Sequence, residues 1–472
     1  MPRTFYAVLA NSLVAFLTNT FVWFAVTFWV YLETESVIAT SVMAGVYAAT
    51  VAGSGFFLGS LVDRYPKRRV MLFSSGSSLV LYALALAIFV STPAGQFADA
   101  SSVNLWVFVV LALFGAIAGN VRAIALSTLV TILVPEDGRD RANGMVGTAN
   151  GVAFLAASIL SGLAIGFLGI AWMLSSAIGL TALVILHLLS LSIPSLPVSR
   201  ADGAEAPAAG TDVRLTGTGV EVPAHGIVEY ADGIDVRGTI RAIRAVPGLF
   251  GLIFFQTFNN FLGGIFMALM DAYGLLLVSV QVWGALWGFL SLGFIVGGLV
   301  VAKKGLGRNP LRTLLLANVA MWSVTTIFTL QASVVLLTVG LFTWLCLIPG
   351  VEAAEQTILQ KVVPPERQGR VFGFAQSVEQ AATPVTAFLI GPIAEWIFIP
   401  FMTTGTGADV LGPWFGTGKD RGLAMLFTVA GAIGLLATLL AMQSTAYRSL
   451  SERYQRPGDE ARPIAIAAHE SA

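Results

Sequence analysis

GSLVDRYPKRRVML, Gly59 to Leu72, places five charged residues in a short turn between two long apolar runs. Such a cluster stands out in a chain of 472 residues of which 56% are hydrophobic and only 11% are charged. The mean hydropathy of +0.82 lies outside the usual range of soluble globular domains. The sequence is therefore that of a membrane protein, and the charged stretch is predicted to be a turn between two membrane spans.

Apolar runs of the length that crosses a bilayer, about 20 residues each, recur along almost the whole chain. Most of them lack the alternation of a barrel strand, and a backbone in lipid must satisfy its own hydrogen bonds, so helices are expected. The predicted fold is an all-α polytopic membrane protein with twelve transmembrane helices. The predicted spans are 5–31, 38–61, 70–91, 103–133, 143–166, 169–193, 248–270, 281–302, 311–330, 333–362, 371–399 and 422–443.

The distribution of positive charge fits this span count. Lys and Arg residues are expected in alternate loops on the cytoplasmic side of a membrane protein. With a cytoplasmic N-terminus, all but three of the 26 Lys and Arg residues fall on that side. The exceptions are Lys419 and Arg421, predicted to lie outside, and Arg122, inside the fourth span. Both termini are therefore predicted to be cytoplasmic. The chain itself is predicted to lie in the cell membrane.

A long polar segment divides the spans six and six. Residues 194–246 are predicted to form a cytoplasmic linker, either a mostly flexible tether or one containing a small hairpin and a short amphipathic helix before Pro247. The predicted domains are thus a six-helix bundle over 1–193, this linker, a second bundle over 247–446 and a cytoplasmic tail over 447–472.

The two halves also repeat each other in sequence. A shift of 229 residues aligns VPEDGRDRANG (134–144) with VPPERQGRVFG (363–373). Because six spans restore the direction of the chain, the repeat predicts two parallel, pseudo-symmetric bundles that face each other. Glycine pairs that would let helix backbones approach closely are expected at interfaces, although they are common in membrane helices generally. They are Gly55/Gly59, Gly147/Gly151, Gly162/Gly166 and Gly293/Gly297.

The opening stretch resembles the signature loop of the major facilitator superfamily. That pattern has a glycine, an acid-arginine pair four residues on and a basic cluster between the second and third spans; here Pro66 replaces the usual glycine. The second half keeps Lys303 and Lys304 but has Ala302 in place of the acid. The resemblance implies that the loop latches the two bundles together on the cytoplasmic side; the alternative is a purely basic anchor, which leaves Asp63 unexplained. The residues assigned to the latch are Gly59, Asp63, Arg64, Lys67, Arg68 and Arg370.

Charged residues inside predicted spans are costly near the bilayer centre, about 3 kcal/mol each, so they should face a cavity or a partner. The shift of 229 residues places Arg122 at nearly the same depth as Glu352. Arginine keeps its proton, whereas a buried glutamate can exchange one. Arg122 is therefore predicted to be a counter-charge or anion anchor. The predicted proton carriers are Glu352 or Glu355, which share a helix face, then Glu379. The alternative is a permanent salt bridge that only positions helices.

The resemblance implies that the first, fourth, seventh and tenth helices line a central cavity. Polar residues in the predicted cavity helices could bind substrate or join helices to one another. Glu395 is placed toward the outer side. This group comprises Thr18, Asn19, Gln256, Asn259, Asn260 and Glu395.

Several classes of function are disfavoured by composition. A single cysteine, Cys346, and three scattered histidines make a metal site or Cys/His catalysis improbable, and zero formal net charge gives no indication of nucleic acid. The near-match GTGKD (416–420) lacks parts of a phosphate-binding loop. We therefore expect that the chain is not an enzyme and that it needs no cofactor. The expected partners are a small-molecule substrate, protons and the lipid bilayer, with a monomeric chain.

The segment EAAEQTILQKVVPPERQGRVFGFAQSVEQAATPVTAFLIGPIAEW (352–396) is similar to the exporter branch that contains macrolide and tetracycline efflux pumps and siderophore exporters. The resemblance implies proton-driven export of amphipathic molecules. The fifth span reads AASILSGL (156–163) where the antiporter signature has a Gly-Pro pair, and Arg122 is not followed by the usual Gln-Gly. The alternatives are a dedicated exporter or flippase of a lipid-like or siderophore-like metabolite, or an importer.

Overall fold

A computed structural model describes residues 2–134, 139–193, 240, 243–244, 246–362 and 365–455, and all regular structure within these ranges is helical. The linker prediction over 194–246 falls almost entirely outside the described residues. At its end, Ile243 and Val246 are buried in a hydrophobic cluster with α9, Leu249–Leu277. This contact connects the last residues before Pro247 to the second bundle.

The first half contains the helices of the first six predicted spans. They are α1 (Arg3–Thr34), α2 (Val37–Arg64), α3 (Lys67–Ser91), α4 (Val103–Ala118), α5 (Asn120–Leu133), α6 (Arg139–Leu163) with a π-helical turn η3 (Ala164–Leu168), and α7 (Ile170–Ser190); a short turn η1 (Ala94–Gln96) precedes α4. The predicted fourth span, 103–133, is thus two helices.

The second half follows the same plan and adds short helices. After α9 come α10 (Val280–Lys304), α11 (Pro310–Ile327), α12 (Val334–Val362), α13 (Pro365–Ile393), η4 (Ala394–Phe398), α14 (Ile399–Thr403), α15 (Thr406–Val410), α16 (Gly412–Phe415), α17 (Lys419–Gln443) and α18 (Thr445–Gln455). Within the described chain, nine helices are long and apolar enough to cross a membrane. The full count of twelve spans stays a prediction.

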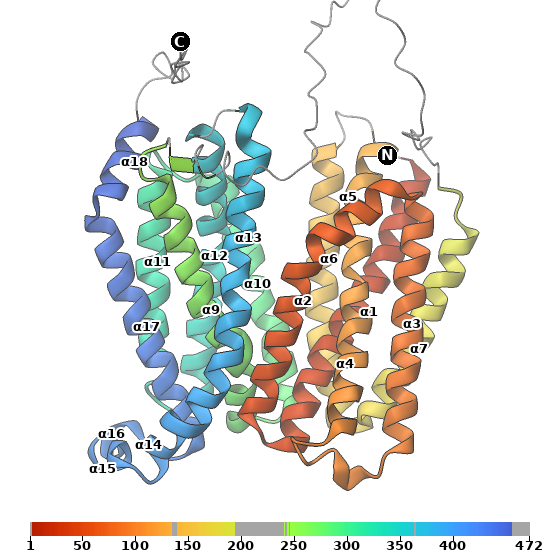
Figure 1. Ribbon diagram of the computed structural model, residues 1–472, viewed down its shortest axis with the longest axis horizontal. Helices are drawn as coiled ribbons and strands as arrows, with labels where there is room; N and C mark the ends of the chain where they lie inside the picture. Colours follow the sequence, from red (N-terminus) through yellow and green to blue (C-terminus); the bar gives the residue numbers. More distant parts are fainter. Residues whose placement is uncertain are drawn as a thin grey trace, which may run out of the picture.

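The helices form two bundles that lie side by side (Figure 1). Helices α1–α7 make one bundle, and α9–α13 with α17 make the other. The beginning of α1 and the end of α18 lie at the same end of the molecule, and α14–α16 lie at the opposite end (Figure 1). We call these the terminal end and the far end. This arrangement is consistent with two bundles through which the chain runs in the same direction.

The two bundles contact each other mainly along two helix pairs, α2 with α13 and α6 with α10, and α9 also contacts α2 and α1. We call this contact between the bundles the seam. At the far end, a Cβ atom on Gly162 would lie 2.6 Å from the Val280 carbonyl oxygen, and one on Gly284 would lie 2.5 Å from that of Ser158. Gly391 of α13 packs just as closely on Ser41 of α2. These glycines allow backbone contact across a seam that is closed at the far end.

The glycine pairs do not all serve this seam. Gly293 and Gly297 pack against Phe342 and Cys346 of α12, so their close contact lies within the second bundle. A Cβ atom added to Gly147 or to Gly151 would meet no other atom within 4 Å. Expecting every pair to mark a close interface was therefore wrong for Gly147/Gly151, because small residues permit a contact without creating one.

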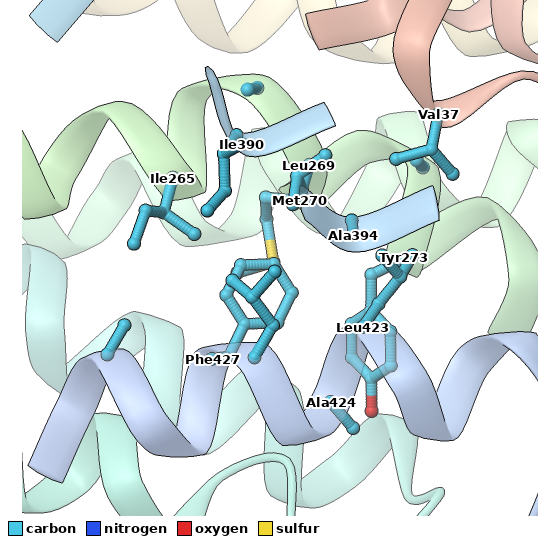
Figure 2. Packing of buried hydrophobic residues seen from close by; sticks show 14 of the residues in the cluster. Val37, Ile265, Leu269, Met270, Tyr273, Ile390, Ala394, Leu423, Ala424 and Phe427 are labelled. Carbon is cyan, nitrogen blue, oxygen red and sulfur yellow. The ribbon is translucent and has the colours of Figure 1, made fainter. Parts of the chain in front are cut away.

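The hydrophobic core of the second bundle extends to the seam (Figure 2). Met270 of α9 and Phe427 of α17 lie together at its centre, and Ile390 of α13 packs beside them (Figure 2). Val37, the first residue of α2, is fully buried in the same cluster. An apolar surface continuous across both bundles thus stabilises the closed far end.

Candidate functional site

A buried arginine occupies the first bundle. Arg122 on α5 is only 3% exposed. Its Nη1 donates to the Ser75 hydroxyl oxygen at 2.8 Å, and its Nη2 donates to Oδ1 of Asn11. Its Nε is buried without a hydrogen-bond partner. Among the residues that the structure describes, Arg122 has no acidic partner, so the permanent salt bridge considered from the sequence is not formed there.

Asn11 connects Arg122 to the end of α7. Because Oδ1 accepts from Arg122, the amide nitrogen faces α7, where it donates to the Val184 carbonyl oxygen at 2.9 Å and lies 3.0 Å from Nδ1 of His187. This orientation makes Nδ1 an acceptor, and the proton of a neutral His187 ring then lies on Nε2. Arg122 is therefore held by neutral groups from α1 and α3, and through Asn11 by α7.

Arg122 lines a cavity of about 240 Å³ in the first bundle. The cavity wall is rich in aromatic side chains with a few amides and hydroxyls, a composition typical of small-molecule sites. The lining residues are Ser12, Phe16, Asn19, Thr20, Trp23, Tyr47, Ala116, Gly119, Arg122, Leu126, Val146, Asn150 and Phe154.

Asn19 lies at the boundary between the two helices of the fourth predicted span. Its Oδ1 accepts from the Tyr82 hydroxyl at 2.8 Å, and its amide nitrogen lies against Gly119, where any side chain would collide with it. Gly119 separates α4 from α5, and Arg122 follows one turn later. Thr18, in contrast, donates to the Val14 carbonyl oxygen of its own helix at 2.8 Å and does not line the cavity.

An acidic cluster occupies the second bundle. Nε2 of Gln256 donates to Oε2 of Glu355 at 2.6 Å, and Oε1 of Gln256 accepts from Asn259 at 3.1 Å. Oδ1 of Asn259 in turn accepts from the indole of Trp322 at 2.9 Å. This chain of hydrogen bonds joins α9, α11 and α12 and fixes the orientation of each amide.

Glu379 of α13 completes the cluster. Its carboxyl group interacts directly with that of Glu355, and its Oε1 is buried without a hydrogen-bond partner. Two carboxyl groups in contact are stabilised when they share one proton, because two adjacent negative charges repel each other. We call Gln256, Glu355 and Glu379 the acidic cluster.

The remaining predicted site residues lie elsewhere. Glu352 is exposed although Glu355, one turn later, is only 8% exposed. The backbone carbonyl of Asn260 accepts from Thr383 at 3.4 Å. Glu395 lies in η4 at the far end, half-buried, with Oε2 buried and unpartnered. The structure thus brings Gln256, Asn259, Glu355 and Glu379 together; Glu352, one turn before Glu355, is exposed but near enough for the charges of the two carboxyl groups to act on each other.

The charged turn of the opening stretch is described only in part. Arg68 donates from Nη2 to the Leu189 carbonyl oxygen at 2.6 Å and from Nε to that of Leu188 at 3.4 Å, and so caps the end of α7. Lys67 is the first residue of α3. The side-chain positions of Gly59, Asp63, Arg64 and Arg370 lie outside the described residues, so the latch remains a prediction.

Two charged residues that hydrogen-bond to other helices were not assigned roles from the sequence. Asp271 of α9 accepts hydrogen bonds from the indoles of Trp283 at 2.9 Å and Trp287 at 2.8 Å. Asp271 was missed because the seventh span was predicted to end at residue 270, whereas α9 continues to Leu277. An acidic residue next to apolar sequence on both sides was the available signal.

Arg421 of α17 is the second missed residue. It is 2% exposed and donates to the Tyr273 hydroxyl at 2.9 Å and to the Thr329 carbonyl oxygen at 3.1 Å, and it pairs with Asp420 at 2.9 Å. Nearly all its donors are used, which indicates an anchor between helices. No group of three or more His, Cys, Asp or Glu residues suited to a metal occurs in the described ranges.

Comparison with known proteins identifies relatives of this chain. Residues 8–387 match the family model of the Major Facilitator Superfamily. Macrolide efflux protein A of Streptococcus pyogenes is 22% identical over 419 residues, which cover 85% of this chain and 92% of that protein.

Solved structures share the fold. A bacterial homologue of the human lysosomal transporter Spinster, inward-facing and unoccupied, has a TM-score of 0.63 at 15% identity and covers 96% of this chain and 98% of its own. The nucleoside transporter NupG has a TM-score of 0.65 at 13% identity, with 94% and 100% covered. A D-xylose-proton symporter has a TM-score of 0.58 at 14% identity, with 94% and 98% covered.

Proposed function

The chain belongs to the major facilitator superfamily, a family of membrane transporters rather than enzymes, and from this premise we propose that it exports amphipathic small molecules in exchange for protons. The single observation that carries the proposal is the division of charge between the bundles: a buried arginine in the first and a buried acidic cluster in the second. Alternating access then moves substrate past groups that can exchange a proton.

The acidic cluster is the proposed proton carrier. Glu355 and Glu379 interact directly, so a proton bound there relieves their repulsion. Gln256 donates to Glu355 at 2.6 Å and stabilises its ionised form when the proton leaves. Glu352 is exposed, whereas Glu355 is only 8% exposed and Glu379 has a buried, unpartnered Oε1, so we assign the role to Glu355 and Glu379.

The cavity beside Arg122 is the proposed substrate contact in the first bundle. Aromatic side chains such as Trp23 and Phe154 offer apolar faces, and Asn19 and Asn150 offer hydrogen bonds. Arg122 keeps its charge throughout the cycle and supplies a fixed positive potential. The cavity therefore suits a molecule with a large apolar surface and a hydrogen-bond acceptor.

The closed seam defines the proposed state in the transport cycle. We propose that the termini are cytoplasmic, that the far end faces outward and that the chain resides in the cell membrane. The seam contacts of Gly162 with α10 and of Gly391 with α2 then close the outer side. The described conformation corresponds to an inward-facing state.

The proposal is tested by the retention of lipophilic drugs and fluorescent dyes in cells lacking their own pumps. Cells with the wild-type chain should retain less of at least one compound, and a protonophore should restore retention. Glu355→Gln should restore retention without a protonophore, while Glu352→Gln serves as the matched control. Lower retention that a protonophore leaves unchanged would exclude proton coupling.

The similarity to macrolide efflux protein A favours export over import, at 22% identity across most of both chains. An exporter of a lipid-like metabolite is the second candidate, and the apolar cavity wall is the observation that favours it. Unchanged retention of every drug in the panel, with efflux of a labelled lysolipid, would select this candidate.

A further inference from the structure

The Asp271 carboxylate is held by two tryptophans, and no cationic side chain of the described residues pairs with it. The indole nitrogens of Trp283 and Trp287 both donate to its Oδ1, at 2.9 and 2.8 Å. No described residue donates to Oδ2. Asp271 is half-buried in α9, a helix long and apolar enough to cross a membrane, where an ionised carboxylate with only neutral donors is poorly compensated.

The charged groups around α9 do not supply the missing partner. On the elements that pack against or continue α9, the titratable groups on the side of the far end are Tyr31, Glu33, Glu35, Tyr47, Tyr273, Glu395, Lys419, Asp420 and Arg421, and Glu379 lies in the middle of α13. None of them forms a hydrogen bond or ion pair with Asp271 in the described chain. Arg421 instead binds Tyr273 and Asp420, and Lys419 donates to the Glu35 carbonyl oxygen.

The surroundings also disfavour a metal ion at this position. Indole N–H groups donate hydrogen bonds and cannot ligate a cation, so a metal would find a single carboxylate. A proton needs no further ligands. It would neutralise Oδ2 while Oδ1 continues to accept from both indoles.

The segment of α10 that donates hydrogen bonds to Asp271 of α9 also forms part of the seam between the bundles. Trp283 and Trp287 lie four residues apart and point to Asp271, while Gly284 and Gly288 lie on the adjacent face. Gly284 packs on the backbone of Ser158 and Gly162 in α6. The Trp287 ring also approaches Phe24 of α1, with centroids 6.1 Å apart. Asp271 is therefore hydrogen-bonded to the same stretch of α10 that contacts the first bundle.

We propose that Asp271 is a proton-binding site whose protonated form favours the closed seam between α6 and α10. Opening the seam admits water, which solvates the ionised carboxylate, so by linkage proton binding stabilises the closed far end. The step is the transfer of one proton from a hydronium ion to Oδ2: one O–H bond of hydronium breaks, leaving water, and one O–H bond forms on the carboxyl group. The site itself does not depend on the proposed drug export; only its use in a transport cycle rests on it.

Proton binding is measured on the purified full-length chain in lipid nanodiscs, without substrate or gradient, by pH-difference infrared spectroscopy. The wild-type spectrum should contain a carboxylic-acid C=O band that Asp271→Asn removes. The asparagine side chain keeps an oxygen that can accept from both indoles. Asp409→Asn, the same change at an exposed residue of α15, should leave the band in place. A spectrum of D271N with every wild-type carboxyl band present would overturn the proposal.

A second variant guards against misfolding of D271N. Trp287→Phe removes one donor to the carboxylate and should move the midpoint of the same band to higher pH; an unmoved midpoint counts against the site.

Coupling to the seam is measured with two spin labels. They are attached at Ala98→Cys and Thr406→Cys, which are exposed on the two bundles, in a chain whose own cysteine is removed by Cys346→Ala. Their distance should lengthen at high pH in wild type and stay short in D271N. Equal pH responses would overturn the coupling.

Discussion

The amide nitrogen of Gln256 lies 2.6 Å from Oε2 of Glu355, and this hydrogen bond joins α9 to α12 inside the second bundle. Glu379 approaches the same carboxyl group from α13. Three helices of one bundle thus converge on one acidic group. In the proposed mechanism, each helix must keep its position for the cluster to hold or release a proton, which would link protonation to helix packing.

Glu355→Gln should uncouple transport from the proton gradient. The amide is nearly isosteric and can still accept from Gln256, so folding should be kept while the exchangeable proton is lost. Gradient-driven transport should fall by roughly tenfold or more, in the range of typical coupling energies, whereas substrate counterflow should persist. Glu352→Gln, exposed on the same helix, should retain both activities. Loss of gradient-driven transport in E352Q with normal activity in E355Q would reverse the assignment.

Asn11→Ala should destabilise the first bundle. The substitution leaves Nη2 of Arg122 buried without its acceptor and removes the hydrogen bond to Val184. A buried donor that loses its partner costs about 1–3 kcal/mol in the free energy of unfolding. The thermal midpoint in detergent should fall, while Asn104→Ala, whose hydrogen bond to Gln96 is exposed, should leave it nearly unchanged. Equal midpoints for both variants would remove Asn11 from its structural role.

Gly162→Ala should hold the far end open. The added methyl group would lie 2.6 Å from the Val280 carbonyl oxygen and 3.1 Å from Cα of Gly284, and backbone atoms cannot move aside as a flexible side chain can. The distance between spin labels at positions 98 and 406 should lengthen and transport should slow. Gly151→Ala on the same helix meets no atom within 4 Å and is the control. A short label distance in G162A would show that the seam tolerates the methyl group.

Arg421→Ala should lower stability without altering proton coupling. Arg421 binds Tyr273 and Thr329 and is 2% exposed, so its loss leaves buried acceptors unpaired. Hydrogen bonds to a charged group contribute about 1.5–3 kcal/mol each. The thermal midpoint should fall well below that of Arg308→Ala, a change at an exposed arginine. In protein that remains folded, the ratio of protons to substrate should be unchanged; a changed ratio would place Arg421 in the coupling mechanism.

The positions of the helices could be predicted from the sequence, because spans in lipid are long apolar runs. Predicted span 333–362 corresponds to α12 despite the internal Pro349. The close contact at Gly119 could not be predicted, since it is made with Asn19 of another helix. The predicted seventh span ends one residue before Asp271, because an acidic residue lowers the local hydropathy whether or not the helix continues.

For the candidate site, the sequence predicted how deep each charged residue lies along its helix, but not toward which neighbouring helix its side chain points. The internal repeat placed Arg122 and Glu352 at similar levels, yet a repeat does not reveal which sector of a helix faces a neighbour. Residues three apart on a helix differ by about 60° in direction. That rotation separates the exposed Glu352 from the buried Glu355 on α12. Asn11 and Ser75 were missed as partners of Arg122 because hydrogen bonds between distant helices have no local pattern.

The central claim is that protons bound at Glu355 and Glu379 drive the export of amphipathic molecules. The most direct test measures proton and substrate fluxes together in proteoliposomes, using a substrate identified by the cellular panel. An imposed pH gradient should drive substrate transport in the wild type, substrate movement should carry protons in the opposite direction, and E355Q should abolish both gradient-driven fluxes. Substrate transport of equal rate with and without the gradient, in both wild type and E355Q, would contradict the account.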